Sequence, residues 1–181
     1  MSICSARRRK ARLIWSFNKF IMLNIKLICV GKLREKYYIE AFQEYVKRLG
    51  AYCRLDCLEI AEQRLLEHPG EKEIAAALER EAGEILRAVP ADAFLCALCV
   101  EGKQIPSEGM AEMIAARENS GKPKLCFVIG GSFGLSPAVK QRADFKLSFS
   151  PMTFPHHLAR VMLAEQIYRG FKINEGSRYH K

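Results

Sequence analysis

The sequence predicts a single α/β domain with a mainly parallel sheet flanked by helices on both faces. Segments with strand-like and helix-like patterns alternate along the whole chain, there is no internal repeat, and 181 residues are enough for one domain with a full core. The composition, 49% hydrophobic and 27% charged, is that of an ordinary globular protein and excludes disordered and collagen-like classes. No apolar run approaches the roughly 18 residues that a membrane-spanning helix needs.

The first half of the chain predicts strands at residues 24–30 and 55–60 and helices at 38–49 and 71–89, with a polar loop at 61–70. The strands show apolar alternation or a short apolar run. The helices place apolar residues three and four positions apart, and a glycine and a proline end them.

The second half predicts strands at residues 93–100, 124–129 and 145–149, each followed by a helix. Ser107 can cap a helix that runs to residue 119, and Ser136, followed by a proline, can cap a short one. Apolar residues at helical spacing predict a last helix from about residue 158 to 171 and leave a polar tail at 175–181.

Three of the predicted strands end in segments of unusual composition: residues 99–102, 130–134 and 149–154. If the strands are parallel, these segments converge on one edge of the sheet. Ligands of such sheets bind in the crevice beyond the carboxyl ends of the strands. We therefore expect the functional site at this edge.

The segment Gly-Gly-Ser-Phe-Gly at 130–134 follows a strand and precedes a capped helix, a position that favours anions. Its spacing is not G-x-G-x-x-G, and Phe154 stands where a ribose-binding acid is expected. No Gly-Lys-Ser/Thr follows, so the segment is not a P-loop. A dinucleotide oxidoreductase is disfavoured, and a simple tight turn stays open.

The net charge of +9 is concentrated at the N-terminus, where residues 1–21 carry six cations and no acid. The remainder carries 23 basic and 20 acidic residues, which supports nucleic-acid binding only weakly. We expect residues 1–21 to be a basic extension outside the fold and residues 22–181 to form the domain. An upstream start without consequence, a basic arm that touches RNA and an uncleaved signal are the three interpretations of the extension.

The seven cysteines follow no disulfide framework and indicate reduced thiols. Cys96 and Cys99 lie within a predicted buried strand, where positions three apart point to opposite faces. Core packing is therefore favoured over a redox pair or a zinc site, and no metal is expected.

Several motifs together resemble one known family. They are Phe-Val-Ile-Gly-Gly-Ser-Phe-Gly-Leu-Ser at 127–136, Leu-Ser-Phe-Ser-Pro-Met-Thr-Phe-Pro-His at 147–156, Glu-Gln-Ile-Tyr-Arg-Gly-Phe-Lys at 165–172 and the terminal Tyr-His-Lys, with a similar opening at 28–37. The chain resembles the ribosomal RNA large subunit methyltransferase H family, small members of the SPOUT class, over residues 22–181.

The resemblance implies a C-terminal deep trefoil knot and a cytoplasmic homodimer. It also implies S-adenosylmethionine-dependent methylation of N3 of a pseudouridine in helix 69 of 23S ribosomal RNA. The cofactor site that it implies comprises Leu98, Gly130, Phe149, Ser150, Pro151, Met152, Thr153 and Phe154.

The reaction removes a proton from N3, and histidine has a suitable pKa for a base. His156 matches the family's Pro-His, and the resemblance implies that Tyr179 and His180 form a catalytic or substrate-binding tail. His68 is expected to be solvated surface, and His157 receives no role. RNA contacts are expected from cations of the last helix and tail, namely Arg160, Arg169, Lys172, Arg178 and Lys181.

Because the domain at residues 22–181, without the basic N-terminal extension, is nearly neutral, we expect an assembled ribosomal surface, rather than bulk charge, to determine the substrate. Two other functions stay open at this point. One is a knotted RNA-binding module without catalysis, and the other is a nucleotide-dependent redox enzyme that uses Cys96 and Cys99.

Overall fold

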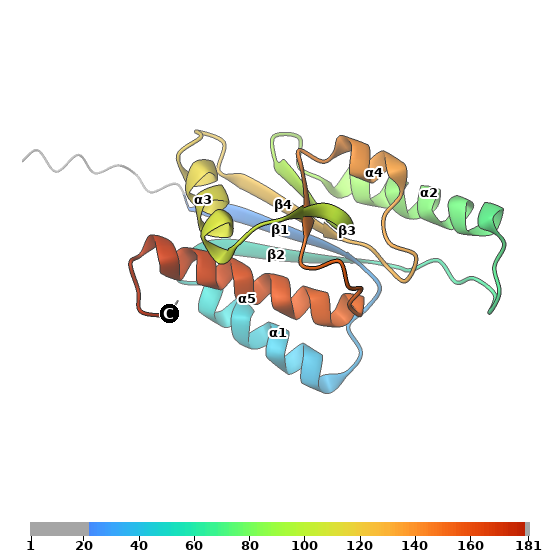
Figure 1. Cartoon of the computed structure of the whole chain (residues 1–181), viewed down its shortest axis with the longest axis horizontal. Helices are drawn as coiled ribbons and strands as arrows, with labels where there is room; N and C mark the ends of the chain where they lie inside the picture. The colour runs from blue at the N-terminus through green and yellow to red at the C-terminus, as the bar shows by residue number, and fades with distance from the viewer. Residues whose placement is uncertain (1–21, 180–181) are drawn as a thin grey trace, which may run out of the picture.

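The computed structural model describes residues 22–179, which form a five-stranded sheet between two layers of helices (Figure 1). The elements in chain order are β1 (Leu23–Val30), α1 (Lys36–Leu49), β2 (Cys53–Ile60), α2 (Glu71–Ala88), β3 (Phe94–Gln104), α3 (Ser107–Glu118), β4 (Lys124–Ile129), α4 (Pro137–Arg142), β5 (Phe145–Ser148) and α5 (His156–Asn174). Each predicted strand and helix is present. The N-terminal extension at residues 1–21 lies outside the described residues.

All neighbouring strands are parallel, in the order β2-β1-β4-β3-β5. Helices α1, α3 and α5 cover one face of this sheet, and α2 and α4 cover the other (Figure 1). The central strands are buried on both sides, which explains their nearly continuous apolar sequences. In β1, for example, Leu27 and Cys29 pack toward the first layer, whereas Ile28 and Val30 pack toward the second. The prediction of a single α/β domain with a parallel sheet flanked by helices is confirmed.

Strand β3 is longer than the sequence predicts, because it continues past the end of β4 to pair again with β5. Leu147 of β5 is the register partner of both Leu98 and Lys103, so the strand is irregular between these two positions. A Cβ atom at Gly102 would lie 2.6 Å from the backbone carbon of Leu147. Glycine at this position therefore allows the close approach, and the irregular segment projects beyond the sheet.

The two predicted caps differ in outcome. Ser136 caps α4, since its hydroxyl accepts a hydrogen bond from the backbone N–H of Val139 at 3.3 Å. The prediction that Ser107 caps α3 is wrong, because Pro106 occupies the N-cap position. The Ser107 hydroxyl instead donates to the side chain of Gln166 at 2.8 Å and so joins α3 to α5.

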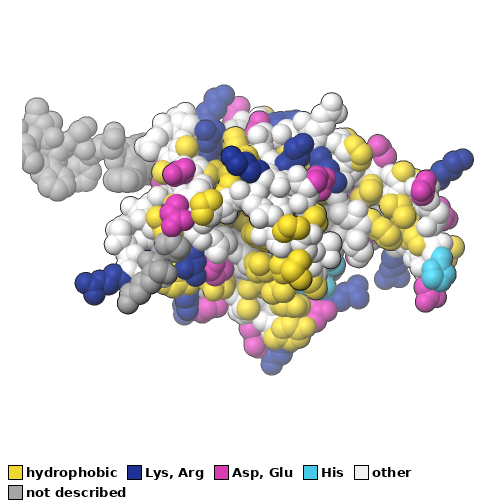
Figure 2. Space-filling view, viewed as in Figure 1, with side chains coloured by type: hydrophobic (Ala, Val, Ile, Leu, Met, Phe, Trp, Pro, Cys, Tyr) yellow, Lys and Arg dark blue, Asp and Glu magenta, His cyan; other side chains and the backbone are white. Residues whose placement is uncertain are grey.

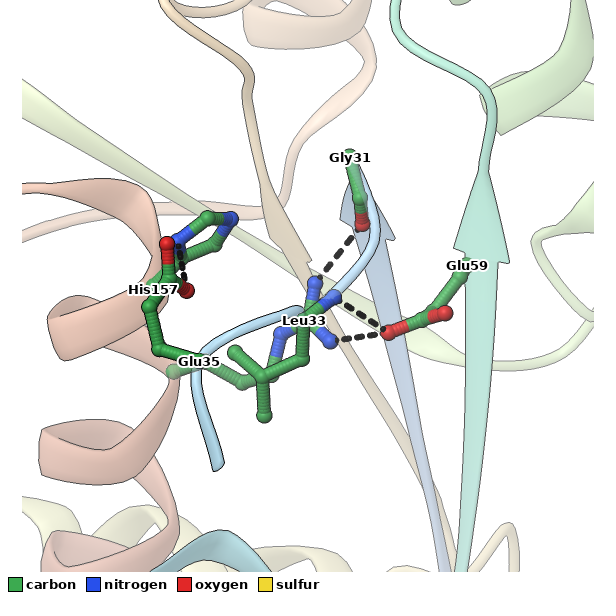
Figure 3. A network of polar contacts seen from close by, with 6 residues as sticks. Gly31, Leu33, Glu35, Glu59 and His157 are labelled. Carbon is green, nitrogen blue, oxygen red and sulfur yellow. Dashed lines mark hydrogen bonds and ion pairs between the residues drawn. The ribbon is translucent and has the colours of Figure 1, made fainter. Parts of the chain in front are cut away.

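Arg160 is the largest charged side chain that the core encloses within residues 22–179. It is 1% exposed. Its guanidinium donates to the carboxylate of Glu59 at 2.5 Å and to the carbonyl of Gly31 at 2.9 Å. Figure 3 shows Gly31, Leu33 and Glu59 converging on this point, where the Leu33 N–H also donates to Glu59 at 3.0 Å. The contacts attach the first turns of α5 to the ends of β1 and β2.

Within residues 22–179, no helix has the length and apolar character that crossing a bilayer requires. On the face seen in Figure 2, basic and acidic side chains are interspersed, so no single-sign field covers it.

We expect Arg160→Met to lower the free energy of unfolding by about 3 kcal/mol, because it leaves the Glu59 carboxylate without its buried partner. Urea denaturation measures the change. The control is Lys36→Ala, which removes an exposed pair with Glu40 and should change stability by less than about 0.5 kcal/mol. Equal stability of the Arg160→Met protein and the wild type would contradict a structural role for this contact.

Candidate active site at the carboxyl ends of the strands

A cavity of about 760 Å³ opens beyond the carboxyl ends of β3, β4 and β5. Its walls come from the three strand exits singled out in the sequence, so the expectation that they converge is confirmed. The residues that line it are Leu98, Cys99, Val100, Glu101, Ile129, Gly130, Gly131, Ser132, Phe133, Gly134, Leu135, Lys140, Ser148, Phe149, Ser150, Met152, Thr153, Phe154, Pro155, His156 and Ala159. Most are apolar or contribute backbone, as in sites for organic ligands.

The structure brings together almost all of the residues expected to bind the cofactor. Leu98, Gly130, Phe149, Ser150, Met152, Thr153 and Phe154 line the cavity. Pro151 belongs to the same loop but is not among the lining residues. Met152 and Phe154 are partly exposed at 70% and 37%, so the cavity presents apolar surface to a ligand.

The turn at residues 130–134 is held by its own backbone. The N–H of Gly134 donates to the carbonyl of Gly131 at 3.0 Å, and Gly134 has a positive φ of 79°. A Cβ atom at Gly130 would lie only 2.2 Å from the carbonyl oxygen of Gly134. Glycine is therefore required at 130 by the turn itself, whatever ligand the turn approaches.

The loop between β5 and α5 is organised by two serines. The Ser148 hydroxyl donates to the carbonyl of Ser150 at 3.0 Å, and the Ser150 hydroxyl accepts from the N–H of Met152 at 3.0 Å. These bonds curl residues 148–152 back toward the cavity. Side-chain hydrogen bonds of this kind let a short loop keep a defined shape without a helix or a sheet.

His156 lines the cavity at the first turn of α5. Burial, and next the neighbouring His157, lowers its pKa from the ordinary value of 6.5. The imidazole is therefore neutral at neutral pH and can accept a proton. His157, which received no role, lies 2.9 Å from the carboxylate of Glu35 through Nδ1 (Figure 3). His68 is exposed, as expected.

Tyr179 is not brought to this cavity within one chain. Its ring lies 5.2 Å from the ring of Tyr168 and 5.0 Å from the guanidinium of Arg169. Tyr168 is twelve positions after His156, which places its ring about 18 Å from His156 along α5. His180 and Lys181 lie outside the described residues.

The predicted RNA-contacting cations fall into different environments. The prediction is wrong for Arg160, because its buried guanidinium is enclosed by the core and cannot reach a phosphate. Arg169 is partly buried and pairs with Glu165 at 2.6 Å, and Lys172 pairs with Glu175. Arg178 is exposed beyond the end of α5.

Two buried or half-buried acids near the cavity have no counterpart in the sequence prediction. Glu62 accepts a hydrogen bond from the backbone of Ser132, and Glu81 is 6% exposed within α2. For Glu81 only a faint signal exists in the sequence, because it occupies an inward position of an otherwise apolar helical stripe. Nothing in the polar segment at 61–70 distinguished Glu62.

Cys96 and Cys99 do not have the environment of a reactive redox pair. Cys29, Cys53, Cys57, Cys96, Cys99 and Cys126 are free thiols, and residues 22–179 contain no cluster of potential metal ligands. Cys96 is buried in the core, where burial raises its thiol pKa, and burial followed by Glu101 raises that of Cys99. Protonated thiols at neutral pH disfavour the redox alternative.

Comparison with known proteins identifies the family. The family model described as "Predicted SPOUT methyltransferase" matches residues 23–180. This chain belongs to the SPOUT methyltransferase family. It is 49% identical over 159 residues to the "Ribosomal RNA large subunit methyltransferase H" of Bacillus pumilus (strain SAFR-032), which covers 88% of this chain and 100% of that protein. A protein of the same name from Clostridium beijerinckii (strain ATCC 51743 / NCIMB 8052) is 47% identical over 159 residues with the same coverage.

The resemblance drawn from the sequence motifs is thus confirmed at the level of the family. For a SPOUT methyltransferase, the cavity at the strand ends is the candidate active site, because it gathers the three motif-bearing loops and the half-buried His156.

We expect Cys53, Cys96 and Cys126 to resist alkylation in the folded protein at pH 8. Burial raises the pKa of Cys53 and Cys126 to about 12 and raises that of Cys96 as well, so few thiolates form. Iodoacetamide labelling followed by peptide mass spectrometry measures the reaction, and urea-unfolded protein is the control in which all three should react. Rapid labelling of Cys96 in the folded protein would revive the redox alternative.

Proposed function

We propose that this chain is an S-adenosylmethionine-dependent methyltransferase that modifies N3 of a pseudouridine in helix 69 of 23S ribosomal RNA. The names of the two relatives support ribosomal RNA as the substrate class. The observation that carries the proposal is the single cavity in which the cofactor-loop residues and His156 meet.

The residues present fit a sulfonium nucleoside. A volume of about 760 Å³ lies within the range of small-molecule sites and is ample for an adenosine with an amino-acid chain. Leu98, Phe149, Met152 and Phe154 offer apolar walls for an adenine ring, and the turn at Gly130 offers backbone groups. S-adenosylmethionine, when bound, supplies a methyl group activated by the positive sulfur.

The side chains of this protein would then do two things. The loops at 130–134 and 149–154 hold the reactants in line, and such positioning accounts for most of the catalysis of a displacement reaction. His156, kept neutral by its lowered pKa, accepts the N3 proton directly or through a water molecule. Arg169, Lys172, Arg178 and Lys181 contact RNA phosphates, and the first two exchange their carboxylate partners for phosphate in doing so.

We propose further that the enzyme is a cytoplasmic homodimer whose C-terminal segment forms a trefoil knot around the cavity. Tyr179 lies far from the cavity of its own chain, so a second copy is needed to bring the Tyr179–His180 tail to it. Hydrophobic side chains gather over α1 and α5 (Figure 2). A second hollow of about 580 Å³, lined by residues such as Tyr45, Val161 and Met162, lies on the same side and supports an association surface there.

The substrate is proposed to be the assembled ribosome. Because the domain carries little net charge outside its N-terminal extension, we expect efficient methylation of ribosomes and poor methylation of naked 23S RNA. Transfer of a labelled methyl group, followed by mass mapping of the RNA, measures both. Equal activity on the two substrates would contradict the ribosome requirement, and a methyl group elsewhere would overturn the helix 69 assignment.

Gly130→Ala should weaken S-adenosylmethionine binding more than tenfold, because the added Cβ collides with the carbonyl of Gly134 and opens the turn. Isothermal titration calorimetry measures the affinity. Gly83→Ala is the matched control, since a Cβ there meets nothing within 4 Å and alanine suits an exposed helix position. If Gly130→Ala binds S-adenosylmethionine as tightly as the wild type does, the turn at 130–134 is not part of the binding site.

A further inference from the structure

Glu62 joins the loop after β2 to the glycine turn of the cavity. Its Oε1 accepts a hydrogen bond from the backbone N–H of Ser132 at 2.8 Å, although the two residues are 70 positions apart. Ser132 is part of the cavity wall, but Glu62 is not among the lining residues. The carboxylate therefore supports the cavity wall through Ser132 without lining the cavity itself.

The turn is shaped around this carboxylate. A Cβ atom at Gly131 would lie 2.7 Å from Oε1 of Glu62 and 3.0 Å from the side chain of Val30. The backbone at 131 thus rests directly on the carboxylate, and the absence of a side chain there permits the contact. One acid consequently supports two consecutive residues of the turn.

The other carboxylate oxygen of Glu62, Oε2, lies near His156. A Cβ atom at Gly31 would lie 2.9 Å from Nε2 of His156 and 3.8 Å from Oε2 of Glu62, so the imidazole and the carboxylate flank the same small residue. The groups that act on His156 are His157 and Arg160 of α5, Glu62 of the β2 loop and Glu35 before α1. Glu62 favours the charged imidazole, whereas burial, His157 and Arg160 oppose it.

Glu62 is itself held in place and ionised. The N–H of the next residue, Gln63, donates to the buried carboxylate of Glu81 at 2.9 Å, which anchors the loop to α2. Burial raises the pKa of Glu62, but the hydrogen bonds from the Ser132 backbone and hydroxyl outweigh it and the pKa is lowered. The group is therefore a fixed negative charge at neutral pH.

We propose that Glu62 is a positioning residue of the cavity: it holds the turn at 130–134 in its binding shape and places a negative charge near His156. This inference rests on the proposed function, because the ligand that the turn would hold is S-adenosylmethionine. Because Glu62 does not line the cavity, we expect it to act through Ser132 and His156 rather than by contact with the donor.

The test uses Glu62→Ala and Glu62→Gln in the full chain. Glu62→Ala leaves the Ser132 N–H without its acceptor, and we expect S-adenosylmethionine to bind about tenfold more weakly in calorimetry. In Glu62→Gln the amide oxygen still accepts from Ser132, so affinity should return to within about threefold of the wild type. Glu67→Ala, an exposed acid of the same loop, is the control and should bind as the wild type does.

A second readout separates positioning from general stabilisation. Glu62→Gln keeps the hydrogen bond but removes the charge beside His156, so the imidazole pKa should fall below its wild-type value. Titration of the histidine ring signals by NMR measures the shift, and His156→Asn assigns the signal. A loss of stability alone would not move this pKa in the folded protein.

The outcomes separate a failure of the proposed function from a failure of the role proposed for Glu62. If the wild type does not bind S-adenosylmethionine, the proposed function fails and this inference fails with it. If the wild type binds and Glu62→Ala binds equally well, only the role of Glu62 is overturned. Equal weakening in Glu62→Gln and Glu62→Ala, or an unchanged His156 pKa in Glu62→Gln, would likewise overturn it.

Discussion

The buried guanidinium of Arg160 is the contact on which the geometry of the site depends. It ties α5 to the ends of β1 and β2 through Gly31 and Glu59. His156 lies four residues earlier on the same helix and so faces the same side, directly over Gly31. A charge enclosed in the core must keep its partners, since an unpaired one is very costly there. The position of the candidate base is thereby set by an ion pair that does not touch the cavity.

The loops that line the cavity are also constrained in shape, because close backbone contacts and hydrogen bonds hold them. The turn at 130–134 closes on itself with no room for a side chain at Gly130, and the end of β3 presses on β5 at Gly102. In the loop between β5 and α5, the hydroxyl groups of Ser148 and Ser150 hold the backbone through hydrogen bonds. A site built this way enters the reaction with its loops already ordered, which lowers the cost of aligning two reactants.

The sequence predicted the elements and their convergence well because both depend on local patterns. Apolar periodicity located the strands and helices, and the parallel arrangement then required the motif-bearing loops to meet. It failed at Arg160, since a cation on a helix looks solvated unless its partner is known, and Glu59 is 101 residues away. Glu62 was missed for the same reason, because its meaning lies in a contact with Ser132 that no spacing reveals. The role of Gly130 could be assigned only from the three-dimensional structure, because a turn that closes on itself and a turn that admits a ligand can have the same sequence.

The short edge strand β5 has a consequence for how the protein comes into being. Among the strands of residues 22–179 it pairs with β3 alone, and the loop that follows it completes the cavity. During synthesis from the N-terminus, the sheet can assemble through β4 while the cavity still lacks one wall. The long separations that hold α5 in place predict slow late steps in folding. The nascent chain therefore has no complete cavity until β5, the loop after it and α5 have all left the exit tunnel.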